Sequence, residues 1–269
     1  MSSLTRKALA LALTGAMAVC AVPALPAQAQ ETRLEAQASG IWRQGSDGRW
    51  WFDLGDGDYL WGDRYTIGGT DYVFDDNGWM YAGGWAPVHG WNGTAWYYVD
   101  GAGVVQTGWL SLTEGWFYLD PSRGGAMRTG WMQNSDGRYY YFFSSGVMAT
   151  GWQYLGNDSG SAWYYFDYSG LSCSGWMWDG SYWYYLSTSD DHLVSGLAQV
   201  GGSWYLFCDE YGGSVPFGAM RTGWFVDPAR SDDSYIAYMY FGDDGARRSS
   251  CEVEGYAIDA EGYYYHPRG

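Results

Sequence analysis

The residues of this chain that could do chemistry are aromatic rings, and they recur in a fixed block. The clearest copies of the block are Trp96-Tyr97-Tyr98-Val99-Asp100, Trp116-Phe117-Tyr118-Leu119-Asp120 and Trp163-Tyr164-Tyr165-Phe166-Asp167. The face of an aromatic ring is electron-rich, so several rings together can hold a quaternary ammonium group, which has no hydrogen-bond donor. Sugars also stack on Trp and Tyr faces. The block therefore predicts a binding surface for a small cation or a carbohydrate.

The chain shows no arrangement of residues that is typical of an enzyme. Its histidines, His89, His192 and His266, are far apart and lack the spacing of metal ligands. Neither a GxSxG motif nor a glycine-rich phosphate motif occurs. Asp100, Asp120 and Asp167 stand where hairpin turns need such residues. We predict a non-catalytic protein that needs no cofactor.

Two other site types receive little support. The cysteines outside the amino-terminal segment number three, so at most one disulfide can form, and no CxxC motif indicates zinc; these cysteines are Cys173, Cys208 and Cys251. Asp53, Asp56 and Asp58 could bind calcium weakly, although they lack the full loop pattern.

The elements that must position the rings follow from an internal repeat. A Gly-Trp pair precedes each block, and successive copies are spaced 24, 22, 21, 24, 21 and 27 residues apart, counting from Trp85 to Trp224 and including Leu197 where one tryptophan is replaced. A block rich in aromatic and β-branched residues predicts a strand, and turn residues and a second short strand follow it. Each repeat is therefore expected to be one β-hairpin plus a loop.

A lone hairpin of this size buries too little apolar surface to be stable, so each must stack on its neighbours. We expect an all-β solenoid, a superhelix of tandem β-hairpin repeats of about 20–25 residues. Strand alternation places the first and third aromatic residues of a block on one face and the second and fourth on the other. The middle tyrosines Tyr97, Tyr140, Tyr164 and Tyr184 are expected to belong to the core.

The predicted organisation has five parts. Residues 1–29 have the layout of a secretory signal peptide that ends in Ala27-Gln28-Ala29, and the alternative of a lipoprotein is disfavoured because Val19 precedes Cys20. A leader follows at 30–39, then degenerate repeats at 40–84, regular repeats at 85–224 and degenerate capping repeats at 225–269. The mature chain is expected to be secreted and not membrane-spanning.

The net charge bears on the partner. The formal charge is −16, and removal of residues 1–29 takes away Arg6 and Lys7, which makes it −18. Such a chain repels phosphate backbones, so we expect no nucleic-acid partner, whereas a cationic or neutral ligand is compatible with it.

The repeats resemble the cell-wall-binding repeats of the choline-binding family, which are related to the glucan-binding repeats of secreted glucosyltransferases. The segments closest to that pattern are Gly125-Ala126-Met127-Arg128-Thr129-Gly130-Trp131 and Gly146-Val147-Met148-Ala149-Thr150-Gly151-Trp152. The resemblance covers nearly all of the mature chain. It implies attachment to choline-bearing teichoic acid or a similar wall polymer at the cell surface.

The resemblance also implies ligand sites between successive repeats. Each would contain the Trp of Gly-Trp, the first aromatic residue of its block and the third of the next block. The four predicted sites are Trp85, Trp96 and Tyr118; Trp109, Trp116 and Tyr141; Trp131, Tyr139 and Tyr165; and Trp152, Trp163 and Tyr185.

The pattern weakens at both ends. Trp176 and Trp183 would meet Leu206 instead of a tyrosine, and a last site of Trp224, Tyr238 and Tyr265 follows a long insertion. No site is expected near the start, where Asp71 and Val73 replace aromatic residues. Two alternatives remain open: the same repeats could bind glucan or a host glycan, or they could display loops to a protein partner.

Overall fold

The computed structural model describes residues 39–91, 93–157 and 160–268. Within these residues the secondary structure consists of antiparallel strands and one 3-10 turn, η1 (Pro121–Arg123). This confirms the all-β prediction and the tandem hairpins. The winding of the hairpins into one superhelix stays a prediction, and the signal peptide and residues 30–38 of the leader lie outside the described residues. None of the helical structure in the described part is long and apolar enough to span a membrane.

The chain divides into two units, and each is treated by itself. The first comprises residues 1–130 and 142–148, and the second comprises residues 131–141 and 149–269. The first unit contains β1 (Ile41–Gln44), β2 (Trp50–Gly55), β3 (Asp58–Tyr59), β4 (Arg64–Ile67), β5 (Thr70–Val73), β6 (Gly84–Gly90), β7 (Gly93–Val99), β8 (Gly108–Leu112), β9 (Gly115–Asp120) and β10 (Ala126–Met127). Its hairpins are β1–β2, β4–β5, β6–β7 and β8–β9, with β3 added beside β2 and β10 beside β9.

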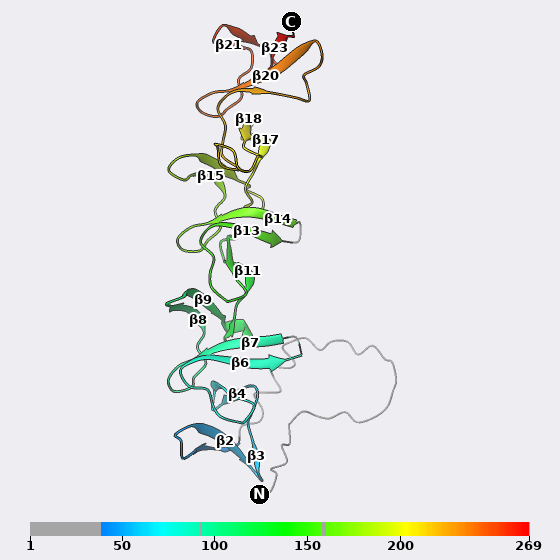
Figure 1. Cartoon of the computed structure of the whole chain (residues 1–269). Helices are drawn as coiled ribbons and strands as arrows, with labels where there is room; N and C mark the ends of the chain where they lie inside the picture. The colour runs from blue at the N-terminus through cyan, green and yellow to red at the C-terminus, as the bar shows by residue number, and fades with distance from the viewer. Residues whose placement is uncertain (1–38, 92, 158–159, 269) are drawn as a thin grey trace, which may run out of the picture. The chain divides into compact units, whose positions relative to one another are not determined.

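The β11–β12 hairpin (Gly130–Gln133 and Tyr139–Phe142) contributes most of its residues to the second unit. The other strands of that unit are β13 (Gly151–Asn157), β14 (Gly160–Phe166), β15 (Gly175–Trp178), β16 (Trp183–Leu186), β17 (Gly196–Val200), β18 (Ser203–Phe207), β19 (Gly223–Val226), β20 (Tyr235–Phe241), β21 (Cys251–Val253), β22 (Tyr256–Ile258) and β23 (Tyr264–Pro267). Consecutive strands pair as hairpins, and β23 pairs with β20. Figure 1 labels most of these strands and shows β13 and β14 as a pair of antiparallel arrows.

Aspartates hold the turn that follows several of the blocks. The Asp100 carboxylate accepts hydrogen bonds from the backbone N–H groups of Ala102 and Val104, at 2.9 and 3.0 Å. Asp167 does the same for Ser169 and Leu171. Such side-chain bonds stabilise a turn against the extended chain. The turn role predicted for these aspartates is confirmed.

Burial alternates along each block, as a strand with one covered face requires. In β14, Tyr164 and Phe166 are 2% and 0% exposed, whereas Trp163 and Tyr165 remain half-buried. Among the middle tyrosines, Tyr97 and Tyr184 are buried like Tyr164, and Tyr140 is half-buried. The second and fourth residues therefore form the core, and the first and third remain accessible.

Backbone hydrogen bonds join each hairpin to the segment that follows the next hairpin. The carbonyl of the first residue of a block accepts the bond, and the donor lies at least 30 residues further along the chain. We call this donor the bridge residue. The degenerate blocks are counted in the same way; they are Trp50-Trp51-Phe52-Asp53, Asp71-Tyr72-Val73-Phe74, Tyr238-Met239-Tyr240-Phe241 and Tyr263-Tyr264-Tyr265. The bonds of the first unit are Met80 to Trp50, Val105 to Asp71 and Met148 to Trp116, and those of the second are Ser172 to Tyr139, Leu193 to Trp163, Met220 to Trp183 and Arg247 to Trp204, all at 2.7–2.9 Å.

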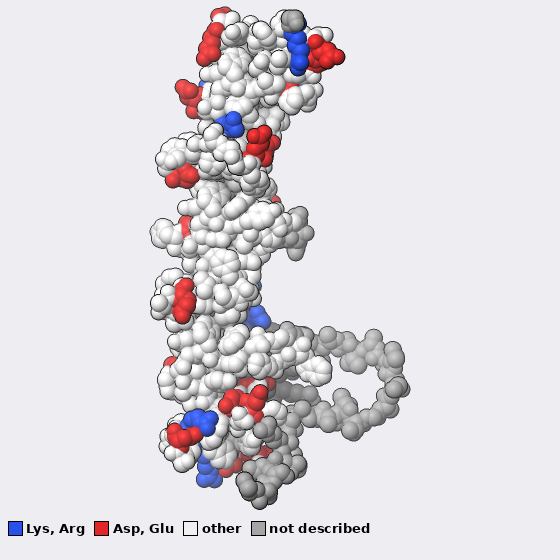
Figure 2. Space-filling model, in the orientation of Figure 1, with Lys and Arg blue, Asp and Glu red and all other residues white. Residues whose placement is uncertain are grey.

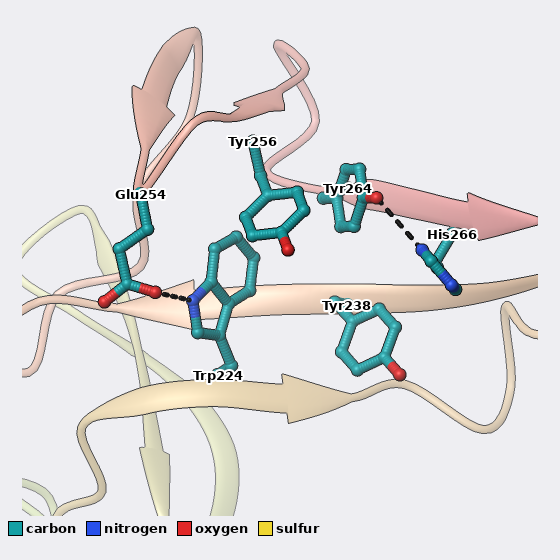
Figure 3. A pocket seen from close by; sticks show the side chains of 6 residues that line it. All are labelled: Trp224, Tyr238, Glu254, Tyr256, Tyr264 and His266. Atoms are coloured by element: carbon teal, nitrogen blue, oxygen red, sulfur yellow. Dashed lines mark hydrogen bonds between the residues drawn. The ribbon is translucent and has the colours of Figure 1, made fainter.

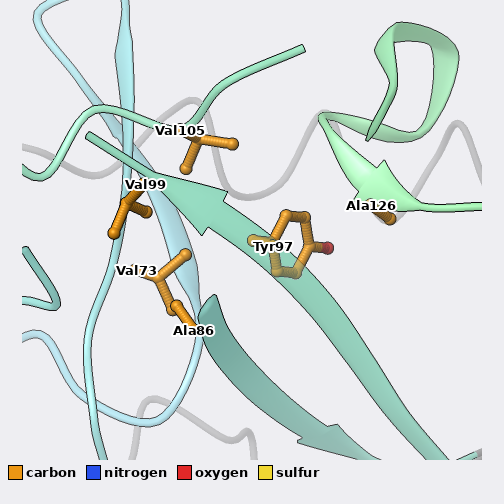
Figure 4. Packing of buried hydrophobic residues seen from close by; sticks show 6 residues of the cluster. All are labelled: Val73, Ala86, Tyr97, Val99, Val105 and Ala126. Carbon is orange, nitrogen blue, oxygen red and sulfur yellow. The ribbon is translucent and has the colours of Figure 1, made fainter. Parts of the chain in front are cut away.

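The core is a series of small clusters, each of which is shared by neighbouring hairpins. Figure 4 shows one in the first unit, where the Tyr97 ring and five aliphatic side chains come together; these are Val73, Ala86, Val99, Val105 and Ala126. They come from β5, β6, β7 and β10 and the segment after β7. No hairpin has a core of its own, which agrees with the expectation that they are stable only when stacked.

The three described cysteines are free thiols. Cys208 is buried, and Cys173 and Cys251 are half-buried. Hydrogen bonds and apolar packing, not a disulfide, therefore hold the described hairpins together.

Candidate functional site

The tryptophan of each Gly-Trp pair lies opposite the third residue of its own block. Trp152 pairs with Tyr165 across the β13–β14 hairpin, and their ring centroids are 5.1 Å apart. The same cross-strand pair recurs as Trp85 with Tyr98, Trp109 with Tyr118, Trp176 with Tyr185 and Trp224 with Tyr240. This register places the tryptophan on the accessible face, beside the first aromatic residue of the block.

The ring that the next hairpin contributes is the second residue of its block. Trp131 contacts Tyr164 at 4.8 Å, and Trp152 contacts Tyr184 at 5.1 Å. The other examples are Trp42 with Tyr72, Trp85 with Phe117, Trp176 with Tyr205 and Trp224 with Tyr264. The accessible face of one hairpin is thus covered in part by the opposite face of the next.

We define a cage by four residues and name it by its tryptophan. These are the Gly-Trp tryptophan, or Trp42 at the same register after Ile41, the first residue of the same block, the second residue of the next block and the bridge residue. The first two residues typically meet edge to face, with ring centroids 6.2–6.5 Å apart in the pairs Trp109–Trp116, Trp131–Tyr139, Trp176–Trp183 and Trp224–Tyr238. Such walls can surround a guest without closing over it.

The tyrosines that the sequence placed in the cages lie beside them. Tyr118, Tyr165 and Tyr185 pack against the tryptophans of their own hairpins, Trp109, Trp152 and Trp176. Tyr141 belongs to the second unit and packs against Trp131, whereas Trp109 and Trp116 belong to the first.

The predicted tryptophans and the first residues of their blocks lie on the same face of each hairpin. Trp96 is 41% exposed on the same face as Trp85, Trp131 lies with Tyr139, and Trp152 and Trp163 line one apolar cluster. Sequence reasoning missed the contacts of the second residues with these tryptophans. Tyr205 is half-buried, whereas Phe117, Tyr164 and Tyr184 are only 4%, 2% and 4% exposed and contact the tryptophans as core residues. Strand alternation already contained the signal, because a hairpin that offers its first and third residues to one neighbour must offer the second and fourth to the other.

The Trp42 cage is an open pocket at a place where the sequence suggested no site. Trp42 and Trp50 meet at 84°, and the bridge residue Met80 and Tyr72 complete the lining, with Ala102 at its edge. Its volume is about 270 Å³. Tyr72 is the second residue of its block, so Asp71 and Val73 do not prevent the cage.

The Trp224 cage is the richest in rings (Figure 3). Trp224, Tyr238 and Tyr264 occupy the standard positions, and Tyr256 from β22 adds a fourth ring, 5.8 Å from Trp224. The indole N–H of Trp224 donates to the Glu254 carboxylate at 3.1 Å, and the Tyr264 hydroxyl lies 3.1 Å from Nδ1 of His266. The pocket measures about 270 Å³. The short β21–β22 hairpin supplies Glu254 and Tyr256, which the repeat pattern did not indicate.

The Trp176 cage uses Tyr205, not Leu206. Trp176 and Trp183 are 39% and 43% exposed, and Tyr205 lies 4.8 Å from Trp176. Leu206 points to the opposite face of β18, where it packs with Phe225 against a buried cluster. The bridge residue Met220 bonds to the Trp183 carbonyl at 2.7 Å, as Met80 does to Trp50.

In two cages of the second unit, a cage residue forms a hydrogen bond with a polar side chain. In the Trp131 cage the bridge residue is Ser172, which is 1% exposed and donates its hydroxyl proton to the Asp191 carboxylate. In the Trp152 cage the indole N–H of Trp163 donates to the Tyr211 hydroxyl at 3.2 Å. Burial and a hydrogen bond to Asp179 raise the pKa of Tyr184, which therefore stays protonated.

One repeat fills its cage with its own cation. Leu197 replaces the tryptophan, Met239 replaces the second aromatic residue, and Arg247 is the bridge residue. The Arg247 guanidinium lies 5.7 Å from the Trp204 ring centroid and 5.4 Å from that of Tyr263. A cation can therefore occupy this position against aromatic rings.

A metal site finds no support in the described part of the chain, where no three His, Cys, Asp or Glu side chains gather. Asp53 instead forms an ion pair with Arg43 at 3.1 Å.

Comparisons with known proteins bear on the fold. No family model and no curated protein matches the sequence. The modular autolysin LytC from Streptococcus pneumoniae resembles the chain with a TM-score of 0.50 and 21% identity, over 85% of this chain and 47% of that one. CbpJ from Streptococcus pneumoniae TIGR4 has a TM-score of 0.44 and 24% identity, over 84% of this chain and 99% of that one. The choline-binding domain of CbpL from Streptococcus pneumoniae has a TM-score of 0.41 and 21% identity, over 86% of this chain and 100% of that one.

The likeness to LytC, at this level of identity, establishes a shared fold and nothing more. The solved structures that resemble this chain also include alternansucrase in complex with isomaltononaose, with 19% identity and a TM-score of 0.34, over 84% of this chain and 16% of that one.

Proposed function

We propose that this protein is a secreted, non-catalytic attachment protein that binds the choline groups of cell-wall polymers, such as teichoic acids, through its aromatic cages. The observation that carries the proposal is the accessibility of perpendicular ring pairs. Trp176 and Trp183 meet at 86° with about two fifths of each residue exposed, so a guest can reach both ring faces.

A quaternary ammonium group suits these cages better than a hydrogen-bonding ligand does. The walls offer ring faces and methionine side chains, as at Trp42, Trp50 and Met80. Their volume of about 270 Å³ is just below the roughly 300 Å³ at which pockets for drug-sized ligands begin. A compact cation with an apolar surface fits both the size and the chemistry.

The negative charge of the protein also favours a cationic ligand. In Figure 2 acidic side chains are scattered over the visible face, and uncharged surface separates them. Glu254 adds a carboxylate to the rim of the Trp224 cage. The whole chain has a net charge of −16. A negative potential raises the local concentration of cations and opposes binding of anions.

Each cage should be weak and the array strong. A ring face contributes about 0.5–2 kcal/mol toward a cation, so three rings, after the entropy of binding is lost, give a dissociation constant on the order of millimolar. Several such sites facing a polymer with many choline groups hold it through effective concentration. Repetition of a weak site is therefore suited to attachment.

Isothermal titration of the full-length protein with choline tests the proposal. We expect binding heat at roughly 10–50 mM choline, the range that millimolar sites require. Trp176→Ala and Trp183→Ala should each remove one site from the stoichiometry. Trp91→Ala is the matched control, because Trp91 lies fully exposed at the turn of the β6–β7 hairpin.

The absence of heat, or an equal loss in Trp91→Ala, would contradict the proposal. Retention of the protein on a glucan column that choline does not elute, and that Trp176→Ala weakens, would favour carbohydrate binding by the same repeats. Capture of one specific protein together with binding of neither ligand would favour the display of loops to a protein partner.

A further inference from the structure

A second kind of pocket lies on the opposite face of the first hairpin, away from the Trp42 cage. Its volume is about 690 Å³, more than twice that of either measured cage. Three rings line it, Trp51, Tyr59 and Trp79, together with the polar side chains of Arg43, Asp53, Asp56 and Asn77. The lining of the Trp42 cage has no charged side chain, and that of the Trp224 cage has the Glu254 carboxylate but no guanidinium.

The register of the first hairpin explains why the pocket is there. Trp42 pairs with Phe52 and faces the cage, so the alternate pairs, Arg43 with Trp51 and Ile41 with Asp53, face the other way. Trp51 and Asp53 thus hold the second and fourth block positions, which in β14 are the buried Tyr164 and Phe166. No hairpin precedes β1–β2 in the described residues, so these positions are not needed for a core shared with one.

Neighbouring contacts hold the pocket walls in place. Trp51 and Tyr59 meet edge to face at 6.1 Å and 87°. The guanidinium of Arg49 lies 4.2 Å from the Trp79 ring centroid, and the Asp47 carboxylate pairs with Arg49 at 2.7 Å. The pocket is therefore built from side chains that are already positioned.

The polar groups form a set that both donates and accepts hydrogen bonds. Arg43 Nε donates to Asp53 at 3.1 Å, and the backbone N–H of Gly55 donates to the other Asp53 oxygen at 2.9 Å. These bonds, that of Gly55 first, lower the pKa of Asp53, so it remains a carboxylate. The guanidinium and the carboxylate keep further donor and acceptor capacity toward the pocket.

We propose that this pocket binds a neutral saccharide, by stacking sugar rings on Trp51, Tyr59 and Trp79 and by hydrogen-bonding hydroxyl groups to Arg43, Asp53, Asp56 and Asn77. Its volume lies within the roughly 300–1,000 Å³ range of pockets for ligands of drug size, which includes short oligosaccharides. Hydroxyl groups use donors and acceptors alike. A quaternary ammonium has no group that can hydrogen-bond to Arg43, Asn77 or the aspartates, and a phosphate would be repelled by the two aspartates.

Ligand-observed saturation-transfer NMR on the full-length protein tests the inference, with isomaltotriose and N,N′-diacetylchitobiose as probes. We expect a signal from at least one probe, with millimolar affinity. The affinity should fall about tenfold or more in Trp51→Ala and in Arg43→Gln, since each removes one type of contact. Asp56→Asn should weaken binding without altering the fold, because Asp56 is exposed and asparagine tolerates its positive φ of 53°.

Trp176→Ala is the matched control, because it removes a cage and should leave saccharide binding unchanged. The three pocket variants should bind choline as the unaltered protein does. A silent response to both probes, an unchanged signal in Trp51→Ala, or competition of choline with the saccharide would each overturn the inference. None of these results would affect the choline proposal, which the choline titration tests separately.

Discussion

At the scale of single residues, the cages differ in the side chain at the bridge position. Met80 and Met220 occupy it in two cages with complete sets of rings, whereas Arg247 occupies it where the guanidinium lies against Trp204. A long cationic side chain at this position reaches the ring faces from within the chain. The protein itself therefore contains an example of an occupied cage.

Met220→Lys should abolish choline binding at the Trp176 cage. The lysine ammonium can reach the faces of Trp176 and Trp183 and compete with choline at an effective concentration that free ligand does not match. Titration calorimetry should show one site fewer, with an unchanged thermal unfolding midpoint. Arg247→Met is the reciprocal control and should not add a site, because Leu197 and Met239 stand where rings are required. Full choline stoichiometry in Met220→Lys would contradict this role of the bridge residue.

The repeats identify the types of ring but not the ring contacts between hairpins, and the ligand sites themselves stay a prediction. The Gly-Trp tryptophans and first residues, such as Trp131 with Tyr139, lie together as predicted from the repeats. The partner from the next hairpin is displaced by one residue, from Tyr165 to Tyr164 in the ring contacts of Trp131. A one-residue step in a strand changes the face, and only the stacking of hairpins reveals which face the neighbour presents.

At the scale of elements, turn glycines hold the bridge methionines in place. Gly245 has a φ of +76°, and a Cβ atom there would collide with the Met220 side chain. Gly223 has a φ of +93°, and the space around its Cβ position is open. The two glycines therefore share backbone strain and differ in packing.

Gly245→Ala should destabilise the protein more than Gly223→Ala does. Both substitutions carry a left-handed backbone penalty of about 1–2 kcal/mol, and Gly245→Ala adds the displacement of Met220. Urea unfolding should give the larger loss for Gly245→Ala, and choline titration should show a weakened Trp176 cage in that variant alone. Equal losses in stability would mean that the contact with Met220 is unimportant.

The sequence predicted the hairpins because each block has a strand's composition and its turns have aspartate and glycine at fixed positions. It did not predict β21–β22, since Cys251–Val253 and Tyr256–Ile258 follow neither the spacing nor the composition of a block. That hairpin nonetheless supplies Tyr256 and Glu254 to the Trp224 cage. Insertions in a repeat break the period from which the rest is inferred.

At the scale of the whole molecule, stability should fall in acid. Hydrogen bonds from Arg49 lower the pKa of Asp47 below its ordinary 3.8, and those from Gly55 and Arg43 do so for Asp53. Partial burial opposes the change at Asp167, but bonds from Ser169 and Arg138 still lower its pKa. Asp179, Asp190 and Asp244 are shifted in the same direction.

The direction in which stability changes with pH follows from proton uptake. A lowered pKa in the folded state means that the unfolded chain binds protons at a higher pH, so the stabilisation is complete above about pH 4 and is lost as the pH falls through the folded-state values. Buried Asp63 acts in the opposite direction, because burial raises its pKa. Thermal unfolding measured from about pH 6 to about pH 2.5 should show a falling midpoint. Asp53→Asn should flatten the curve, and a midpoint independent of pH would refute the argument.

The cages described within a unit draw side chains from consecutive hairpins. The number of cages therefore follows the number of junctions between repeats and not the number of repeats. Duplication or deletion of one repeat of about twenty residues would change that number by a single step and leave the remaining junctions intact. Within the described residues, no junction uses the Trp51 side of β1–β2, so its side chains can change without disturbing a shared core. If the cages bind a polymer as proposed, the number of repeats sets the strength of that binding and such a face sets a separate specificity.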